Sequence, residues 1–191
     1  MKKLISGIVA VAMALSLAAC QKETKVISLS GKTMGTTYHV KYRDEGSMKA
    51  TTEKTHEEIE AILKDVNAKM STYKKDSELS RFNQNTQVNT PIEISADFAK
   101  VLAEAIRLNK VTEGALDVTV GPVVNLWGFG PEKRPEKQPT PEQLAERQAW
   151  VGIDKIALDM SAAKPTLSKA LPQVYVDLSS IAILTNFVSL D

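Results

Sequence analysis

Apolar and polar residues alternate in several short stretches of the chain, a pattern typical of strands with one buried face. Residues 26–30 and 36–42 form two such stretches, connected around Gly31 and Gly35. Further short strands are expected, each bounded by polar or turn residues, at residues 92–94, 155–158, 166–168 and 174–177. Short strands are therefore distributed over the whole chain and separated by other elements.

Apolar residues three or four positions apart predict a long amphipathic helix after the first two strands. Its apolar stripe consists of Ile59, Ile62, Leu63, Val66 and Met70. The sequence that begins at Thr55 has capping-box spacing, although Thr51 or Thr52 could begin the helix earlier. His56 falls on the solvated side of this helix, where we expect it to have no partner nearby in sequence.

Helix-capping residues predict three more helices. A short one over residues 77–82 is expected to begin from Asp76 as its cap. The next is capped by Ser95, carries Phe98, Val101, Leu102 and Ala105 on its inner face, and ends at Gly114. Residues 140–143 (Thr-Pro-Glu-Gln) combine a cap, a proline in the first turn and a capping-box glutamine.

The stretch from Gly114 to Gly130 holds four of the nine glycines in the chain. Within it, residues 116–120 alternate between apolar and polar, which predicts a half-buried strand, and residues 123–127 fit a short helix. Glycines allow a ligand to approach the backbone closely, so we interpret Asp117 as the edge of a flat, apolar binding site. A strand, a turn and a packed tryptophan would account for the same residues.

The N-terminus has the pattern of an export signal, in which a basic start precedes an apolar run over residues 4–17. The run ends at Cys20 in a sequence that resembles the bacterial lipoprotein signal. Cys20 is the only cysteine of the chain, so it has no internal disulfide partner and lipidation explains it best. We expect residues 1–19 to be removed as a signal peptide and residues 20–25 to form a lipidated tether. An ordinary signal peptide with a chance cysteine is the alternative.

Charge and composition narrow the class of partner. Without Lys2 and Lys3, 22 of the 24 basic residues of the chain remain and nearly equal its 23 acidic residues, which argues against nucleic acid as a partner. The two histidines, His39 and His56, and the single cysteine form no cluster of zinc or haem ligands. The remaining length fits one domain of ordinary size.

Four segments, taken in order, carry a resemblance to a known family. They are residues 33–38 (TMGTTY), 70–83 (MSTYKKDSELSRFN), 114–130 (GALDVTVGPVVNLWGFG) and 176–182 (VDLSSIA). Together with the lipoprotein signal they resemble the ApbE family of bacterial lipoproteins, the FAD:protein FMN transferases. The resemblance implies an α+β, ApbE-like flavin transferase fold of helices and short antiparallel sheets over residues 26–182.

The resemblance also implies an activity and a set of site residues. Family members are enzymes that cleave FAD at its pyrophosphate with Mg²⁺ and attach the FMN half to a Ser or Thr hydroxyl of an exported acceptor protein. The FAD contacts carried over by motif are Met34, Tyr73, Ala115, Leu116, Asp117 and Asp177. Ser180 is carried over as a contributor to the Mg²⁺ site, and no catalytic group is assigned. The expected location is the periplasmic side of the inner membrane, anchored at Cys20, with the outer membrane as the alternative.

Residues 183–191 depart from the family pattern. Ile183 stands where the family has a charged residue, and the family's remaining metal ligands belong to a further C-terminal portion. The departure is typical of a frameshift, an early stop or a sequence assembly error, so we expect that portion to be missing and this copy to be impaired. The alternative is a non-catalytic periplasmic flavin-binding lipoprotein or an inactive pseudogene product.

Overall fold

The structure is a computed structural model that describes residues 24–44 and 50–179. The chain divides into two compact units, residues 1–62 and 63–191, and each is described by itself. The expected signal peptide, Cys20, Ser180 and the tail over residues 183–191 lie outside the described residues.

A hairpin of two strands forms the first part of the N-terminal unit, as the alternating pattern predicted. β1 (Lys25–Thr33) and β2 (Thr36–Asp44) pair antiparallel along their whole length. Met34 and Gly35 connect them in a two-residue turn, and both have positive φ, +49° and +74°. Such turns match the twist of a hairpin, but they favour glycine or asparagine over methionine. Ile27 and Leu29 of β1 are buried.

The long helix α2 (Thr52–Met70) begins in the N-terminal unit and ends in the C-terminal one. Thr51 starts it, because the Thr51 hydroxyl accepts a hydrogen bond from the Lys54 amide at 3.2 Å. The predicted apolar stripe is present, but no residue of the helix is buried, and Ile62 is 63% exposed. No helix within residues 24–44 and 50–179 has both the length and the apolar character needed to cross a bilayer.

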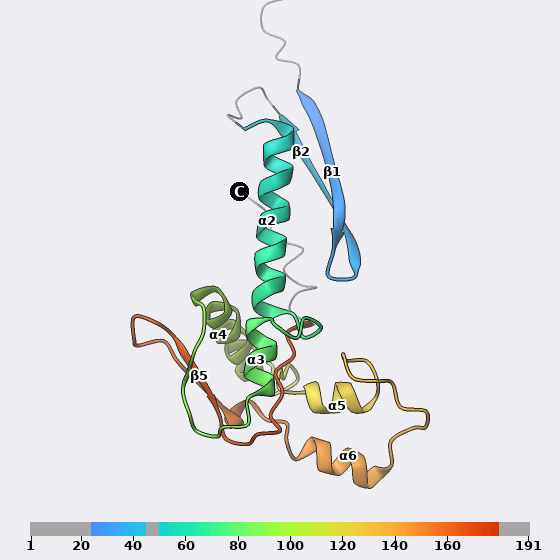
Figure 1. Ribbon diagram of the computed structural model, residues 1–191, viewed down its shortest axis with the longest axis vertical. Helices are drawn as coiled ribbons and strands as arrows, with labels where there is room; N and C mark the ends of the chain where they lie inside the picture. The colour runs from blue at the N-terminus through green and yellow to red at the C-terminus, as the bar shows by residue number, and fades with distance from the viewer. Residues whose placement is uncertain (1–23, 45–49, 180–191) are drawn as a thin grey trace, which may run out of the picture. The chain divides into compact units, whose positions relative to one another are not determined.

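Figure 1 shows the hairpin alongside the first turns of α2, and polar side chains join the two within the N-terminal unit. The Tyr38 hydroxyl donates a hydrogen bond to a Glu60 carboxylate oxygen at 2.5 Å and lies 2.9 Å from Nε2 of His56. A Cβ atom on Gly31 would lie 2.4 Å from Oε1 of Glu60, so only glycine leaves room for this contact. The expectation that His56 has no partner nearby in sequence is wrong, because Oε1 of Glu60, four residues later, lies 3.8 Å from Nε2 of His56.

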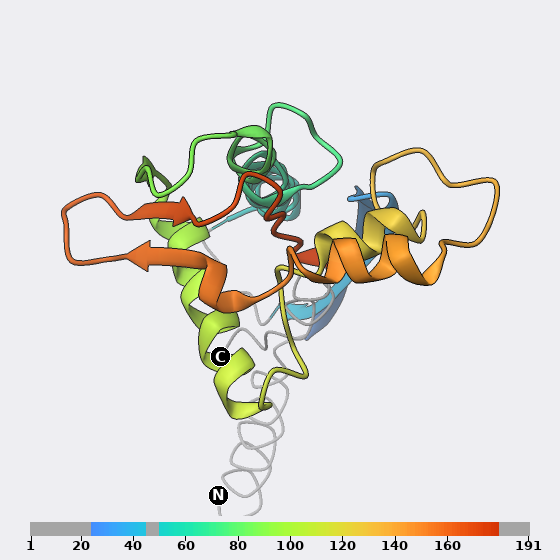
Figure 2. The same cartoon turned by 90° about the horizontal axis from the view of Figure 1, so that it is seen from below.

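The C-terminal unit contains four helices, a 3₁₀ turn and three strands among its described residues. They are α3 (Glu78–Gln84), β3 (Ile92–Glu93), α4 (Ala96–Val111), α5 (Gly121–Leu126), α6 (Pro141–Gln148), η1 (Ile153–Lys155), β4 (Ile156–Asp159) and β5 (Thr166–Lys169). The strands form an antiparallel sheet in the order β3-β5-β4. Figure 2 shows α4 crossing beside the β4–β5 ladder, with α5 and α6 side by side. These elements confirm the predicted fold of helices and short antiparallel sheets.

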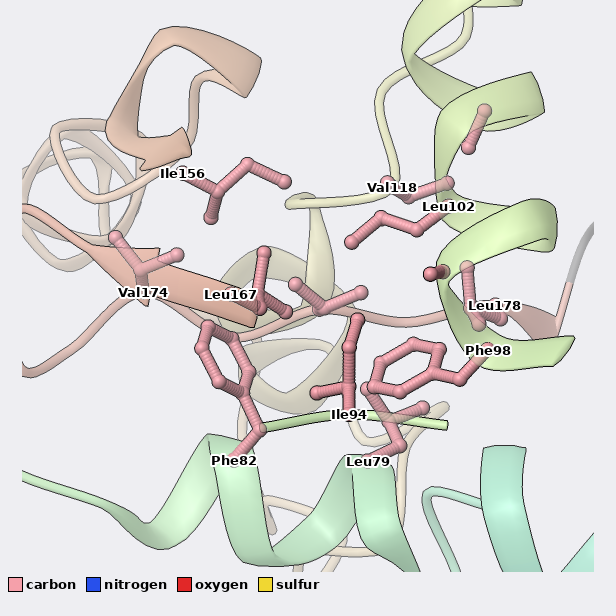
Figure 3. Packing of buried hydrophobic residues seen from close by; sticks show 13 residues of the cluster. Leu79, Phe82, Ile94, Phe98, Leu102, Val118, Ile156, Leu167, Val174 and Leu178 are labelled. Carbon is pink, nitrogen blue, oxygen red and sulfur yellow. The ribbon is translucent and has the colours of Figure 1, made fainter. Parts of the chain in front are cut away.

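The hydrophobic core lies between α3, α4 and the small sheet (Figure 3). Leu79 and Phe82 point into it from α3, and Phe98 and Leu102 point into it from α4. Leu167 of β5 is fully buried between them. Burial of each such side chain stabilises the fold by about 1.5–3 kcal/mol.

The helix caps were largely predicted by the sequence. Ser95 caps α4, and the capping box of Thr140 and Gln143 is present at α6. The expected cap of α3 is wrong by one residue, because Ser77 rather than Asp76 accepts a hydrogen bond from the Ser80 amide, at 3.0 Å. Ser77 is buried and also donates to the Ser71 carbonyl at 2.5 Å, whereas Asp76 is exposed.

Candidate functional site

Residues 116–120 do not form the strand that their alternation predicted. Oδ1 of Asp117 accepts hydrogen bonds from the Thr119 amide at 2.8 Å and from the Thr119 hydroxyl at 2.6 Å. An aspartate that bonds to the backbone two residues later bends the chain into a turn and competes with strand pairing. Only Val120 retains a strand-like contact, a parallel bridge to Tyr175.

A second turn of the same kind follows the segment over residues 174–177, where a strand was also expected. Oδ1 of Asp177 accepts hydrogen bonds from the Ser179 amide at 2.8 Å and from the Ser179 hydroxyl at 2.5 Å. No ladder forms over this segment, which makes only the bridge from Tyr175 to Val120. Each turn therefore holds its aspartate through a hydroxyl residue two positions later.

Backbone contacts place the two aspartate turns side by side. The Asp177 amide donates to the carbonyl of Val118, the residue after Asp117, at 2.7 Å. The Val118 and Val176 side chains are buried below the turns. Asp177 is buried and Asp117 is half-buried, so two aspartates from distant segments stand on neighbouring turns at the edge of the core. We define these residues, 117–119 and 177–179, as the paired aspartate turns.

Neighbouring residues hold the first turn in place. Thr119 is fully buried, and its hydroxyl accepts a hydrogen bond from the Gly152 amide at 2.7 Å while donating to Asp117. The Asn109 side chain donates to the Leu116 carbonyl at 2.8 Å. Ala115 lies between them on the surface and Leu116 is half-buried. The run from Ala115 to Asp117 is thus anchored at both of its ends.

Tyr175 packs closely against the start of α5. A Cβ atom on Gly121 would lie 2.3 Å from the Tyr175 ring, so glycine is needed where the two segments cross. Burial, and secondarily the negative charge of Asp177, raises the pKa of the Tyr175 hydroxyl. The short helix here starts at Gly121 rather than at the predicted Val123, because Pro122 fits its first turn.

Tyr73 and Phe129 form an exposed aromatic pair in the C-terminal unit. The Tyr73 hydroxyl donates to the Phe129 carbonyl at 3.2 Å. The side chains of these two residues are 64% and 72% exposed. Backbone bonds fix the loop that carries Phe129, whose amide donates to the Val124 carbonyl at 3.0 Å. A hydrogen-bonded loop therefore presents aromatic surface to solvent.

The remaining predicted site residues are less closely connected. Met34 occupies the hairpin turn of the N-terminal unit, where it is 42% exposed. A positive φ at a residue other than glycine is uncommon and often marks a functional position. Ser180 lies outside the described residues, and so does Cys20.

Sequence reasoning missed the residues that support the paired aspartate turns. Thr119 and Ser179 stand two positions after the predicted aspartates, and this repeated Asp-X-Ser/Thr spacing was a usable signal. Asn109 gave no such signal, because its role depends on a contact with the chain beyond the end of α4. Within residues 24–44 and 50–179, no three His, Cys, Asp or Glu side chains are grouped so as to hold a metal ion.

Comparison with known proteins gives consistent results. The model of the ApbE family matches residues 34–183. The FAD:protein FMN transferase of Haemophilus influenzae is 93% identical over 182 residues, which cover 95% of this chain and 53% of that protein. The enzyme of the same name from Vibrio cholerae is 52% identical over 175 residues, covering 92% of this chain and 51% of that protein. The chain thus spans about half the length of the curated relatives it matches.

Solved structures show the same fold. The flavin transferase ApbE from Vibrio cholerae superposes with a TM-score of 0.76 at 52% identity, covering 82% of this chain and 48% of that one. The apo flavinyl transferase ApbE from Pseudomonas stutzeri gives a TM-score of 0.77 at 34% identity, covering 85% and 52%. These matches confirm the resemblance on which the expected fold rests.

Proposed function

The chain belongs to the ApbE family, and we propose that it forms part of an enzyme that transfers FMN from FAD to an acceptor protein. In the proposed reaction, a Ser or Thr hydroxyl oxygen of the acceptor bonds to the phosphorus of the FMN half. The bond from this phosphorus to the bridging oxygen of the pyrophosphate breaks, AMP leaves, and the hydroxyl proton is released. The names of the relatives support this reaction.

The observation that carries the proposal is the pairing of the aspartate turns. Carboxylates accept hydrogen bonds from the ribose hydroxyls and ring N–H groups of a flavin nucleotide. Asp117 and Asp177 stand on segments that are fixed to each other by the bond from the Asp177 amide to the Val118 carbonyl. We assign both as FAD contacts, together with the neighbouring Ala115 and Leu116.

Two further residues suit the flat, apolar part of FAD. The exposed ring of Tyr73 offers a stacking surface, and its hydroxyl bond to Phe129 fixes the direction of the ring. The thioether of Met34 is an adaptable apolar contact. We assign both as FAD contacts in the proposed enzyme.

We propose Mg²⁺ as the metal of the reaction. Mg²⁺ takes oxygen ligands, and the donors near the paired aspartate turns are carboxylate and hydroxyl oxygens, which fit this preference. Ser180 follows the second turn directly and is the assigned ligand. Bound there, Mg²⁺ would supply Lewis-acid stabilisation of the charge that develops as the pyrophosphate bond breaks.

We further propose that Cys20 carries a lipid anchor on the periplasmic side of the inner membrane. The test is to express the chain and its Cys20→Ser variant in a Gram-negative host, label with palmitate, and separate the two membranes by density. The unchanged chain should be labelled and should float with the inner membrane, while Cys20→Ser should be unlabelled. Labelled protein in the outer-membrane fraction would contradict the assigned membrane but keep the anchor.

The test of the activity uses the 191-residue chain with FAD, Mg²⁺ and a flavin acceptor domain. Covalent transfer is read as flavin fluorescence of the acceptor in a denaturing gel, and AMP is measured in the same samples. Because the chain spans half the length of its relatives, the Haemophilus influenzae protein serves as the reference.

The samples distinguish the candidate functions. Fluorescent acceptor and AMP in equal amounts support the transferase. Bound FAD without AMP supports a flavin-binding lipoprotein, and loss of both signals in the chain but not in the reference supports an inactive product. Loss of all signals on addition of EDTA, reversed by Mg²⁺, supports the metal assignment.

A further inference from the structure

Lys169 is a buried lysine at the end of β5, and only 2% of the residue's surface is exposed. Its ammonium group donates to three backbone carbonyls, of Asn83 at 3.0 Å, Pro172 at 3.1 Å and Val174 at 3.3 Å. It also lies 5.2 Å from the centre of the Phe82 ring. Burial lowers the pKa of Lys169 to about 8, so the group is still a cation at neutral pH. A buried cation is costly unless its hydrogen bonds are made, and here carbonyl groups make them.

Asn83, near the end of α3, contacts the same segment two residues later, at Val176. Its Nδ2 donates to the Val176 carbonyl at 2.9 Å, and its Oδ1 accepts from the Val176 amide at 2.8 Å. One amide side chain thus satisfies both backbone groups of Val176. This two-way contact is the one that a neighbouring strand would normally supply.

The two side chains together occupy one edge of the segment that leads to Asp177. Lys169 and Asn83 bond to residues 172, 174 and 176, which are alternate positions of the chain. The residues between them face the other way, where Tyr175 bridges Val120 and the Asp177 amide bonds to Val118. Asn83 and Lys169 therefore replace the missing neighbouring strand on one edge, and the first aspartate turn takes the other.

We propose that Asn83 and Lys169 are positioning residues that hold Asp177 beside Asp117 and thereby set the affinity of the site for a flavin nucleotide. The consequence for affinity rests on the proposed function, in which Asp177 contacts FAD. The positioning itself rests only on the contacts of the free chain. Neither side chain needs to touch the ligand, because each acts through the backbone of residues 172–176.

The test compares Asn83→Ala and Lys169→Met in the full 191-residue chain. The matched controls are Gln84→Ala, which removes an exposed side-chain bond to the Lys75 carbonyl from the same helix, and Lys164→Met, which removes an exposed lysine paired with Glu93. Hydrogen exchange of backbone amides is measured without FAD, and FAD affinity is measured by quenching of flavin fluorescence.

Asn83→Ala and Lys169→Met should each accelerate exchange at residues 174–179 by about tenfold or more, because local opening then exposes these amides. Exchange in α4 should be unchanged. The Kd for FAD should rise by a similar factor, and both controls should behave like the unchanged chain. A merely structural role would instead accelerate exchange evenly over α4 and residues 174–179.

Unchanged exchange at residues 174–179 in Asn83→Ala would overturn the proposal, as would an even acceleration over the whole unit. If Lys169→Met does not fold, Asn83→Ala and Asn83→Asp still decide the question. The carboxylate of Asn83→Asp can still accept from the Val176 amide but can no longer donate to the Val176 carbonyl. Absence of FAD binding by both the unchanged chain and the Haemophilus influenzae protein would overturn the proposed function. The exchange data would still decide whether these residues position Asp177.

Discussion

The backbone amide of Asp177 donates a hydrogen bond to the carbonyl oxygen of Val118 at 2.7 Å. Together with the bridge from Val120 to Tyr175, this contact joins two segments that are distant in sequence and that each carry an aspartate held by a hydroxyl residue. The geometry of the candidate site therefore depends on backbone pairing, whereas the two carboxyl groups supply its chemistry.

The carboxylate charge of Asp177 is expected to matter for FAD and not for the fold. In Asp177→Asn the amide oxygen can still accept from Ser179, so the unfolding midpoint should change little. Transfer of FMN should fall by about tenfold or more, because a neutral amide binds a flavin N–H or a metal more weakly than a carboxylate does. Transfer by the full-length relative carrying the equivalent change is the measurement.

Asp159 offers a matched control for this change. Its Oδ1 accepts from the Ser161 amide at 2.8 Å and from the Ser161 hydroxyl at 2.7 Å, so the local turn is the same. These bonds lower the pKa of Asp159. The Asp159 turn is exposed, however, and is not one of the paired aspartate turns. Asp159→Asn should leave transfer unchanged, and an equal loss in both variants would show that the turn itself was responsible.

The Thr119 hydroxyl is expected to stabilise the first turn. Thr119→Val keeps the shape of the buried side chain but removes a donor to Asp117 and leaves the Gly152 amide without its acceptor. The free energy of unfolding should fall by about 1–3 kcal/mol. Thr119→Ser retains the hydroxyl and should lose less. Denaturant unfolding measures both, and equal losses would mean that the methyl group rather than the hydroxyl is important.

Lys169 should make the stability of the protein depend on pH. Its pKa is about 8 in the folded chain and 10.5 in the unfolded one, so between these values the unfolded chain binds more protons. Stability should therefore rise with pH, by about 2 kcal/mol between pH 7 and 9.5. The pKa values of Lys69, Lys164 and Tyr175 are raised, so these groups titrate above that window.

Denaturant midpoints at pH 7 and 9.5 measure the effect of Lys169. The rise should be absent from Lys169→Met, which has no proton to lose. A rise of the same size in that variant would assign the effect to another group.

Tyr38 should ionise later than an ordinary tyrosine. The hydrogen bond to Glu60, with a smaller effect of its negative charge, raises the pKa of Tyr38 to about 12. In an ultraviolet titration to pH 11, the unchanged chain should ionise one tyrosine fewer than Glu60→Gln, among the four that it contains. Identical titration curves would mean that the Tyr38–Glu60 contact does not persist in solution.

Two phenylalanines should differ sharply in their contribution to stability. Phe98 is fully buried in the core, so Phe98→Ala should cost about 3–5 kcal/mol. Phe129 is exposed, so Phe129→Ala should change the free energy of unfolding by no more than about 0.5 kcal/mol. Thermal unfolding of both variants measures the difference. A large loss in Phe129→Ala would mean that the exposed aromatic pair is part of a packed interface.

Elements whose signals are local could be predicted from the sequence. The hairpin, the amphipathic helices and the caps at Ser95 and Thr140 follow from periodicity and from side chains that bond to nearby amides. The short strands β4 and β5 were predicted to within two residues for the same reason. The fold as a whole is confirmed by the match to solved ApbE structures.

Features that depend on distant contacts could not be predicted. The alternation over residues 116–120 is the same as in a strand, but the side-chain bonds of Asp117 override it. The extended segment before Asp177 pairs with the side chain of Asn83 rather than with a strand, which no periodicity reveals. The assigned FAD contacts stay predictions, although Asp117 and Asp177 now have a common location.

The contacts on both edges of residues 174–176 also affect the tendency of the chain to aggregate. Val174, Tyr175 and Val176 form a run with high β-propensity and no charge. An open strand edge on such a run would be a template for pairing with a second molecule. Asn83 satisfies both backbone groups of Val176 on one edge, and Val118 and Val120 cover the other edge. The folded chain therefore leaves no open edge here for a second molecule to pair with. Loss of the Asn83 side chain would thus be expected to promote self-association as well as to loosen Asp177.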